Sequence, residues 1–500
     1  MKVTINRRRF LGSAVASGAF TIVPRHVLGG SGFVAPNDRI TLAHIGMGTQ
    51  GFNELGTLLE APEIQIVAVC DPNRDSSDYV EWSKHSVRNR IRRYLDDPSW
   101  RQGDNGCPGG REVGREVVDT YYAKHRGQEE LGGCRSYADF RELLAEEKDL
   151  DAVKIMTPDH LHATISIAAM KQGKHVLMHK PIANRLAEGR KVVETARKSG
   201  VATHLLAYGS GAANGRIVER IKEGVIGHLR EVHNWSNRPV WPQYTEIPTD
   251  SLPIPNGFDW DLWLGPALPR PYHPDYTHTV FRGWYDFGGG SMADMGIYSL
   301  WPVFTGLNLG APLSAQAWAT HTCTIEDKVS KTKENDFSYP TACSIRLAFA
   351  ARPGMPALDL FWYDGGMKPR LPDAIEAHDV QMKREGILFV GDQGCVLADF
   401  RGQNPEVFTE GQRRPLHIEE ETTSRPGAAR QNTWLQAFLG NEPSPGNFLN
   451  AGSITDAVNL GTVALRTGEK VVFDSENLKI TNLPEANKYL VRDYRRGWEL

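Results

Sequence analysis

The sequence predicts an α/β protein with an N-terminal doubly wound parallel sheet and a C-terminal α/β domain carrying a large, mostly antiparallel open sheet. Two observations lead to this prediction. Between residues 37 and 206, apolar runs alternate with segments of helical periodicity, which is typical of parallel strands joined by helices. Later runs, such as 344–349 and 358–362, alternate apolar and polar residues, as antiparallel strands with one solvated face do. We therefore divide the chain into a leader at 1–36, a parallel-sheet domain at 37–206 and a C-terminal domain at 207–500.

The composition is ordinary for a soluble globular chain of two domains. Of the 500 residues, 40% are hydrophobic and 23% are charged. The net charge of −3 and the lack of a basic block beyond the N-terminus argue against a nucleic-acid partner. None of the six cysteines falls in a C-x-x-C pair, which argues against a zinc knuckle. A disulfide between Cys107 and Cys134 stays open, because spacing alone does not decide it.

The first residues have the pattern of a targeting segment. Residues 6–11, Asn-Arg-Arg-Arg-Phe-Leu, resemble the twin-arginine export motif, and a weakly apolar run of small residues follows at 12–23. That run is too short to cross a bilayer as a helix. We expect export to the periplasm by the twin-arginine route without stable membrane insertion. A basic tail on a cytoplasmic protein is the alternative.

An apolar run over 40–45 leads directly into the motif G-x-G-x-x-G, and residues 52–59 continue with helical spacing. The motif contains Gly46, Met47, Gly48 and Gly51. The first glycine permits a tight turn, the second lets backbone approach a pyrophosphate, and the third lets the helix pack close to the strand. The helix N-terminus then offers free N–H groups to phosphates. This context predicts a dinucleotide site, and a tight turn without a ligand is the alternative.

A second apolar run, 64–70, ends in Asp71, twenty residues after Gly51. An acid at this place binds the adenosine ribose hydroxyls. Its charge disfavours the 2′-phosphate of NADP, whereas Arg74 offers compensation for that phosphate. The sequence therefore predicts NAD, with NADP as the alternative. We interpret the polar stretch 72–133, which is longer than an ordinary connection, as an insertion near the adenosine end of the site.

Further candidate binding residues follow the carboxyl ends of two predicted strands, where ligands of open α/β sheets bind. They are Thr157, Pro158 and His162 after one strand, and His179 and Lys180 after the next. We expect Thr157, Pro158, His162 and Lys180 to contact the cofactor together with Asp71. His160 and His162 could form a metal pair, but no third ligand lies nearby in the sequence, so we predict no metal site.

Six of the twelve tryptophans fall between Trp235 and Trp301, in and around a proline-rich excursion. Flat aromatic faces suit the C–H faces of sugars, and they also fill cores and loops. Their density favours a carbohydrate ligand, with packing as the alternative. After the predicted strands, we expect a helix at 433–438, and we expect this helix and the segment 454–466 to pack back on the body.

These motifs resemble those of the Gfo/Idh/MocA oxidoreductases, and the resemblance covers nearly all of the chain after the leader. The matching segments are 46–51, 70–74, 157–158 with His162, 179–181 and 288–296. The family implies a Rossmann domain followed by an α/β domain whose open sheet covers the active site. It further implies NAD or NADP as cofactor and a sugar or polyol hydroxyl as substrate. Members often self-associate through the C-terminal sheet, so the resemblance also implies a homo-oligomer.

Two positions depart from the family pattern. His179 replaces the glutamate of the usual Glu-Lys-Pro tripeptide, and Tyr298 replaces the histidine that usually follows Asp294. Oxidation of an alcohol needs a base for the hydroxyl proton. We hypothesise that Lys180 lowers the pKa of Tyr298, so that Tyr298 is this base and Asp294 orients the pair. The alternatives are that Tyr298 is a pocket wall and that His179, or no residue, is the base.

Export bears on the reaction, because an exported enzyme has no ready supply of free NAD. We therefore expect an NAD-dependent sugar oxidoreductase whose tightly bound nucleotide is recycled by a second substrate. A redox-neutral glycosidase or lyase that oxidises its sugar only transiently is the first alternative, and the family includes enzymes of that kind. A sugar-binding protein without catalysis is the second, although the retained charges of Lys180 and Asp294 argue against it.

Overall fold

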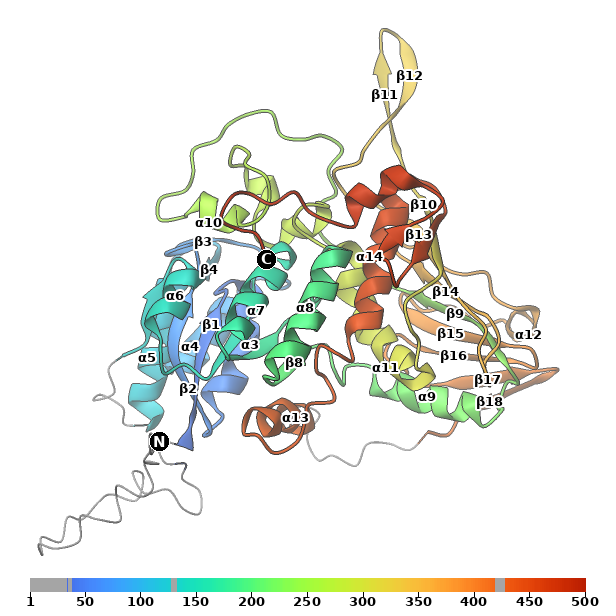
Figure 1. Cartoon of the computed structure of the whole chain (residues 1–500), viewed down its shortest axis with the longest axis horizontal. Coiled ribbons are helices and arrows are strands. Elements are labelled where there is room, and N and C mark those ends of the chain that lie inside the picture. Colours follow the sequence, from blue (N-terminus) through green and yellow to red (C-terminus); the bar gives the residue numbers. More distant parts are fainter. Residues whose placement is uncertain (1–33, 35–37, 127–132, 419–427) are drawn as a thin grey trace, which may run out of the picture.

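The computed structural model describes residue 34 and residues 38–126, 133–418 and 428–500. The predicted export motif lies outside these residues. Within the described ranges, no helix is long and apolar enough to cross a membrane. Figure 1 shows the N-terminal sheet on one side of the molecule and the large C-terminal sheet on the other, with α8 (Leu186–Ser199) and α14 (Gly452–Thr467) between them.

The N-terminal sheet contains six parallel strands in the order β5-β2-β1-β6-β7-β8. They are β1 (Ile40–Ile45), β2 (Ile64–Cys70), β5 (Arg135–Tyr137), β6 (Ala152–Ile155), β7 (His175–Met178) and β8 (Thr203–Leu205). Because the order runs outward from β1 in both directions, a topological switch point lies at the carboxyl ends of β1 and β6. Leu42, Ala43 and Ile45 of β1 are buried, as expected for a parallel strand covered on both faces. The predicted doubly wound sheet is confirmed.

Helices connect these strands. They are α3 (Thr49–Leu59), α5 (Arg111–Arg126), α6 (Phe140–Glu146), α7 (His162–Lys171), which follows η3 (Asp159–Leu161), and α8. The last of them, α8, ends at Gly200, whose φ of +68° is left-handed and favours glycine.

The stretch 72–133 is more regular than predicted. It contains β3 (Ser76–Tyr79), α4 (Ser86–Leu95), β4 (Cys107–Gly109) and α5. Since α5 is the ordinary crossover helix between β2 and β5, the additional structure is confined to residues before 111. Val87, Ile91 and Leu95 form the buried stripe of α4 at helical spacing. The surrounding arginines conceal this stripe in the sequence, so the insertion predicted for 72–133 was given no helix of its own.

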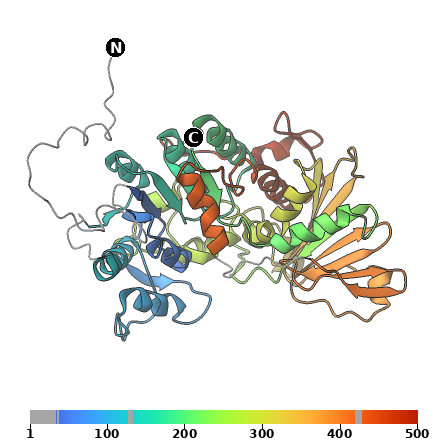
Figure 2. The ribbon, with the colours of Figure 1, turned by 90° about the horizontal axis from the view of Figure 1, so that it is seen from below.

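The C-terminal sheet has ten strands in the order β18-β17-β16-β15-β9-β14-β13-β10-β19-β20. Neighbouring strands are antiparallel, except that β9 and β14 are parallel. They are β9 (Leu229–Trp235), β10 (Ser314–Ala319), β13 (Cys343–Phe349), β14 (Leu358–Tyr363), β15 (Gly386–Gly391), β16 (Cys395–Asp399), β17 (Glu406–Thr409), β18 (Gln412–Pro415), β19 (Val471–Asp474) and β20 (Lys479–Ile480). Figure 2 shows α9 (Ala212–Lys222) lying along one face. This sheet confirms the predicted large, mostly antiparallel one.

Smaller elements complete the C-terminal domain. The hairpin β11 (Thr322–Glu326) and β12 (Val329–Lys333) projects from the body in Figure 1. The others are α11 (Ile297–Leu307), α12 (Asp373–Glu376), α13 (Ala428–Phe438) and η7 (Pro484–Tyr489).

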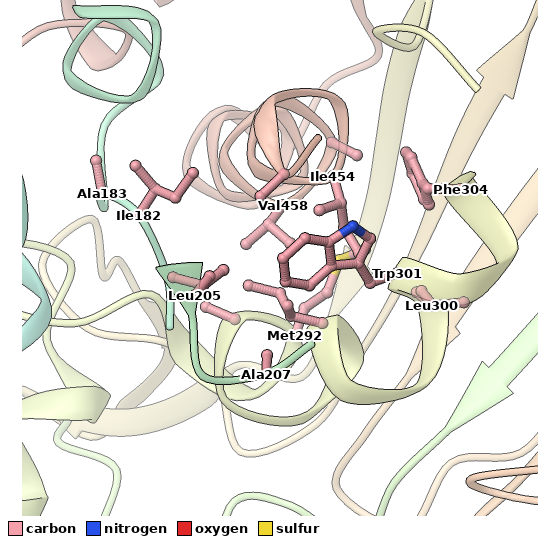
Figure 3. Close-up of a cluster of buried hydrophobic side chains, with 14 of the residues drawn as sticks. Ile182, Ala183, Leu205, Ala207, Met292, Leu300, Trp301, Phe304, Ile454 and Val458 are labelled. Carbon is pink, nitrogen blue, oxygen red and sulfur yellow. The ribbon is translucent and has the colours of Figure 1, made fainter. Parts of the chain in front are cut away.

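One apolar core joins the two domains. Leu205 and Ala207, at the end of the N-terminal sheet, and Ile454 and Val458 of α14 lie around Trp301 of α11 (Figure 3). The division predicted after residue 206 lies between the two sheets, and this shared cluster extends across it.

Between β9 and α11 the chain makes the predicted excursion, with the short helices α10 (Trp260–Leu264), η4 (Pro274–Tyr276), η5 (His278–Gly283) and the π-helical turn η6 (Met292–Gly296). Its aromatic side chains form a separate buried cluster. The six tryptophans between residues 235 and 301 are all buried, so their density reflects packing more than a sugar platform. Cys107 and Cys134 are buried and free, so the disulfide left open above is not formed in the described structure.

Candidate active site

A pocket of about 450 Å³ lies where the strand ends of the N-terminal sheet meet the excursion that follows β9. The N-terminal domain contributes the glycine turn and the residues after β2, β6 and β7. The C-terminal domain contributes Arg238, Arg282, Asp294, Tyr298 and Arg401. Residues from both sheets therefore enclose one site.

The glycine turn has the geometry that the motif requires. Gly46 has a φ of +99°, and a Cβ atom there would lie 2.6 Å from the carbonyl of Met156. A Cβ at Gly51 would lie 2.3 Å from the carbonyl oxygen of Gly46, so α3 packs directly against the turn. The first N–H groups of α3 have no partner within the helix and lie beside the pocket, which Gly48 and Thr49 line.

Asp71 is buried at the end of β2 and lines the pocket. One carboxylate oxygen accepts a hydrogen bond from the N–H of Met47 at 2.7 Å, and the other from the N–H of Asn73 at 2.8 Å. Burial raises the pKa of Asp71, although these two N–H groups oppose the rise. Met47 thus contributes its backbone and does not line the pocket with its side chain. Arg74 is exposed and outside the pocket, so the predicted compensation for a 2′-phosphate is not made here.

Three residues after β6 were predicted to contact the cofactor, and two of them line the pocket. Thr157 and Pro158 do so, and the hydroxyl of Thr157 is buried without a hydrogen-bond partner in the described part of the chain. His162 lies behind them. Its Nδ1 is 2.6 Å from the carbonyl oxygen of Pro181, and its Nε2 is 2.9 Å from that of Thr157. The predicted direct contact of His162 is therefore wrong, because its ring ties together the two strand-end loops.

These residues fit a dinucleotide. Gly46 and Gly48 line the cavity without side chains, which leaves their backbone open to a pyrophosphate, and the unpartnered Thr157 hydroxyl offers a polar group to a ligand. Gly46, Gly48, Asp71, Thr157 and Pro158 would hold the cofactor. Its presence would bring a hydrogen acceptor beside Lys180.

The catalytic end of the pocket contains a buried ion pair. Lys180 Nζ donates to Asp294 Oδ1 at 2.6 Å, and both residues are buried. Burial lowers the pKa of Lys180 to about 8, although Asp294 opposes this shift. Burial alone would raise the pKa of Asp294, but the charges of Lys180, Arg282 and Arg238 hold it well below its usual range. Lys180 is therefore a cation poised to lose its proton near neutral pH.

Arg282 ties this pair to the rest of the site. Its Nη1 donates to Asp159 Oδ1 at 3.2 Å, and its Nε lies 3.6 Å from Asp294 Oδ1. The other oxygen of Asp159 accepts from the N–H of Gly289 at 2.9 Å. The glycine run 288–290 therefore wraps a buried carboxylate and leads into η6, which presents Asp294. Arg282 and Asp159 belong to no sequence motif that predicts their role, although the adjacent glycine run marks this region.

Tyr298 and His179 form a second pair. The hydroxyl of Tyr298 is 3.0 Å from Nε2 of His179. Burial, with the charges of Lys180 and Arg282, lowers the pKa of His179 well below its ordinary value, so its ring is neutral. Burial and the charge of Asp294 raise the pKa of Tyr298. The prediction that Lys180 makes Tyr298 a phenolate is therefore wrong. Lys180 forms its ion pair with Asp294, and its Nζ lies 5.2 Å from the centroid of the Tyr298 ring. Tyr298 is a protonated phenol.

A strap from both domains covers the glycine turn. The ring of Tyr79 on β3 lies against Gly48, where an added Cβ would be 2.8 Å from Tyr79 Cε1. His278 of the excursion packs on Tyr79 with ring centroids 4.1 Å apart, and its Nε2 is 3.4 Å from a carboxylate oxygen of Asp78. Figure 1 shows β3, β4 and α10 next to one another.

The backbone reinforces this strap. Asn73 forms an isolated antiparallel bridge with Phe258, and the N–H of Arg74 donates to the carbonyl oxygen of Gly257 at 2.8 Å. The N–H of Asp259 donates to the carbonyl oxygen of Pro72 at 3.0 Å. No spacing in the sequence predicts the contact between Tyr79 and His278, because the two residues lie about 200 positions apart.

The described residues contain no group of three or more histidine, cysteine or acidic side chains that could hold a metal ion. His160 is buried, and its Nε2 lies 2.9 Å from the carbonyl oxygen of Trp263. Its role in the described structure is to anchor the excursion.

Two family models match the chain in succession. One describes the NAD-binding Rossmann fold of the Gfo/Idh/MocA oxidoreductases and matches residues 110–206, and the other describes the C-terminal α/β domain and matches residues 222–353. Both domains match one oxidoreductase family. The N-terminal domain is an NAD-binding Rossmann domain, which agrees with the predicted cofactor.

Curated relatives align with parts of the chain. Levoglucosan dehydrogenase of Pseudarthrobacter phenanthrenivorans is 35% identical over 119 residues, which are 22% of this chain and 30% of the relative. The 1,5-anhydro-D-fructose reductase of Ensifer adhaerens is 39% identical over 124 residues, which are 23% of this chain and 36% of the relative. A glycosyl hydrolase family 109 protein of Shewanella putrefaciens is 23% identical over 242 residues, which are 45% of this chain and 44% of the relative. The matches thus span less than half the length of each relative.

A solved structure of similar fold is the WlbA dehydrogenase of Bordetella pertussis in complex with NADH and UDP-GlcNAcA. It superposes with a TM-score of 0.51 at 14% identity, covering 87% of this chain and 99% of the other. A levoglucosan dehydrogenase in complex with NADH and L-sorbose superposes with a TM-score of 0.50 at 13% identity, covering 87% and 98%. These structures show that the two-domain fold is shared.

Proposed function

We propose that this protein is an NAD-dependent oxidoreductase that oxidises a hydroxyl group of a sugar or polyol. The observation that carries the proposal is the buried Lys180–Asp294 pair in the same pocket as the glycine turn. A dinucleotide site alone suits many functions, whereas a buried lysine with a lowered pKa beside it suits removal of a hydroxyl proton. The named relatives that act on carbohydrates support this substrate class.

Lys180 is the proton acceptor in this proposal. In its neutral form it takes the hydroxyl proton, and Asp294 then faces the ammonium at 2.6 Å. NAD, when bound, supplies the acceptor for the hydrogen that leaves the carbon with its electron pair. Arg282 and Arg238 keep Asp294 ionised, so that it stabilises the newly protonated lysine.

Tyr298 has a different role from the one predicted. As a phenol next to a neutral imidazole, it donates a hydrogen bond to His179 and offers its oxygen to the substrate hydroxyl. The Tyr298–His179 pair can thus orient the hydroxyl and pass a proton onward, while Lys180 provides the basic group.

We further propose that the nucleotide stays bound through the catalytic cycle. The strap of Tyr79, His278 and the Asn73–Phe258 bridge closes over the glycine turn from both domains, so release of a nucleotide requires these contacts to separate. Twin-arginine export, which we propose from residues 6–11, would carry the folded protein with its nucleotide to the periplasm.

A second candidate is redox-neutral cleavage of a glycosidic bond through transient oxidation of the sugar. The alignment with a glycosyl hydrolase family 109 protein extends over 45% of this chain, and Tyr298 stands where the family usually has histidine. The same pocket and the same Lys180 would serve this reaction.

The test is to purify the protein without added nucleotide, denature it and identify what it releases by mass. We expect about one NAD per chain, retained through dialysis. His278→Ala removes the ring contact and the ion pair with Asp78, and it should speed nucleotide loss about tenfold. His273→Ala is the matched control, since His273 lies in the same excursion with acidic neighbours but outside the pocket.

Two outcomes would contradict these proposals. If freshly purified protein contains no nucleotide, the proposed retention is wrong. If added NAD also fails to bind, the proposed oxidoreductase function is wrong. Turnover of glycosides without external cofactor, and with no net change in absorbance at 340 nm, would favour the redox-neutral candidate.

A further inference from the structure

The catalytic end of the pocket carries more positive than negative side chains. Five cations lie there or directly behind it, namely Lys154, Lys180, Arg238, Arg282 and Arg401. Three carboxylates face them, namely Glu54, Asp159 and Asp294. Each carboxylate is already shared: Asp294 contacts three cations, Asp159 pairs with Arg282, and Glu54 lies 3.8 Å from Lys154. Two positive charges are therefore left without a counter-charge from the described chain.

Arg401 is the clearest of these cations. It follows β16 directly, lines the pocket, and places its Cζ 5.5 Å from the ring centroid of Tyr298. No carboxylate of the described ranges lies within ion-pair distance of it, and Asp399, two residues earlier, pairs instead with Lys383 at 2.5 Å. The side chain is exposed, so its guanidinium is available to a ligand beside Tyr298.

Arg238 is the second cation whose guanidinium has unused hydrogen-bond donors. It approaches Asp294 only through Nε, at 3.4 Å, and its side chain is 23% exposed. Its Nη1 donates to Asn237 Oδ1 at 3.3 Å, and its Nη2 makes no hydrogen bond to the described residues. Since a guanidinium presents five donors in a planar fork, most of the donors of Arg238 remain for a ligand in the pocket.

We propose that the substrate is an acidic sugar, whose anionic group binds Arg401 and Arg238 while the hydroxyl to be oxidised lies against Lys180 and Tyr298. A carboxylate, a sulfate ester or a phosphate ester supplies the required chemistry, because each presents oxygens to a guanidinium fork. A neutral sugar would gain no charge-assisted hydrogen bonds from these two guanidinium groups. This inference rests on the proposed oxidoreductase function, and it makes Arg401 and Arg238 specificity residues.

The experiment compares neutral and acidic versions of one sugar with the NAD-loaded protein at fixed ionic strength. Calorimetric titration with D-glucose, D-galactose, D-glucuronate, D-galacturonate, glucose 6-sulfate and glucose 6-phosphate gives Kd for each. We expect at least one acidic sugar to bind about tenfold or more tightly than its neutral parent. The uronates and the esters show which anion is recognised.

Variants locate the effect. Arg401→Gln and Arg238→Gln should each reduce the ratio of neutral to acidic Kd, and the double variant should abolish the preference. Arg413→Gln is the control, because Arg413 pairs with Glu406 across β17 and β18 and lies outside the pocket. An acidic preference that survives in the double variant would overturn the proposal, as would binding of no acidic sugar or equal binding of acidic and neutral sugars.

Absorbance at 340 nm separates this inference from the proposed function. Reduction of bound NAD by neutral sugars with no acidic preference leaves the oxidoreductase standing and removes the acidic substrate. An acidic sugar could instead bind through the two arginines while neither NAD is reduced nor its glycosides are cleaved. That result would support the acidic-sugar specificity and contradict the proposed oxidoreductase.

Discussion

The two halves of the pocket are built in different ways. The N-terminal half, with the glycine turn and Asp71, consists of short turns at the ends of parallel strands, whose geometry is fixed by local backbone. The C-terminal half, with Arg238, Arg401 and Tyr298, consists of long side chains from loops and short helical segments, and its geometry depends on contacts between side chains. The first half therefore suits a ligand of constant shape, and the second suits discrimination between substrates.

Lys180 lies at the junction of the halves, so replacing it should give the largest effect. Lys180→Met keeps the volume but removes the proton acceptor, and we expect turnover to fall at least about 10³-fold. Nucleotide content measured by mass should stay near one per chain, because the N-terminal half is intact. Lys191→Met on the exposed face of α8 is the control. Turnover within tenfold of the wild type would exclude Lys180 as the base.

Tyr298 belongs to the C-terminal half, and its loss should cost less. Tyr298→Phe removes the hydrogen bond to His179, and we expect kcat to fall about 10- to 100-fold with KM little changed. Steady-state kinetics on the NAD-loaded protein measures both. Tyr339→Phe removes another buried hydroxyl, bonded to Thr462 outside the pocket, and should leave kcat unchanged. Equal values for wild type and Tyr298→Phe would make Tyr298 a pocket wall.

A substitution in the N-terminal half of the pocket should weaken binding of the nucleotide. Gly51→Ala places a Cβ 2.3 Å from the carbonyl oxygen of Gly46, so α3 must shift away from the turn. We expect less than about a tenth of the wild-type nucleotide to copurify. Gly310→Ala adds the same methyl where nothing lies within 4 Å and should retain full occupancy. Normal nucleotide content in Gly51→Ala would mean that the turn adapts more easily than its geometry indicates.

The last prediction concerns the dependence of kcat on pH. Because the base must be neutral and burial lowers the pKa of Lys180 to about 8, kcat should rise about tenfold per pH unit below this value and level off above it. Measuring kcat of the NAD-loaded protein as a function of pH tests this rise. Activity that instead falls as pH rises through 8 would indicate that the protonated lysine is the working form.

The sequence predicts the N-terminal half well and the other half poorly, for a physical reason. Gly46, Asp71 and Lys180 follow strands of the same sheet, so their proximity is a property of the fold class. Arg282 and Arg401 reach the pocket through tertiary packing, which leaves no spacing to recognise. The prediction of a lowered pKa for Tyr298 was wrong for a related reason. The sequence motifs place Lys180 near Tyr298, but they do not show that Lys180 forms an ion pair with Asp294.

In the proposed retention of the nucleotide, the bridge between Asn73 and Phe258 would give nucleotide exchange the character of a local unfolding reaction. The amide hydrogens of Arg74 and Asp259 are bound across the same seam, so the opening that frees a nucleotide also exposes them to solvent. Their hydrogen–deuterium exchange therefore runs at the pace of the opening. Under the proposed retention, the lifetime of the bound nucleotide would be set by how often these few backbone hydrogen bonds open.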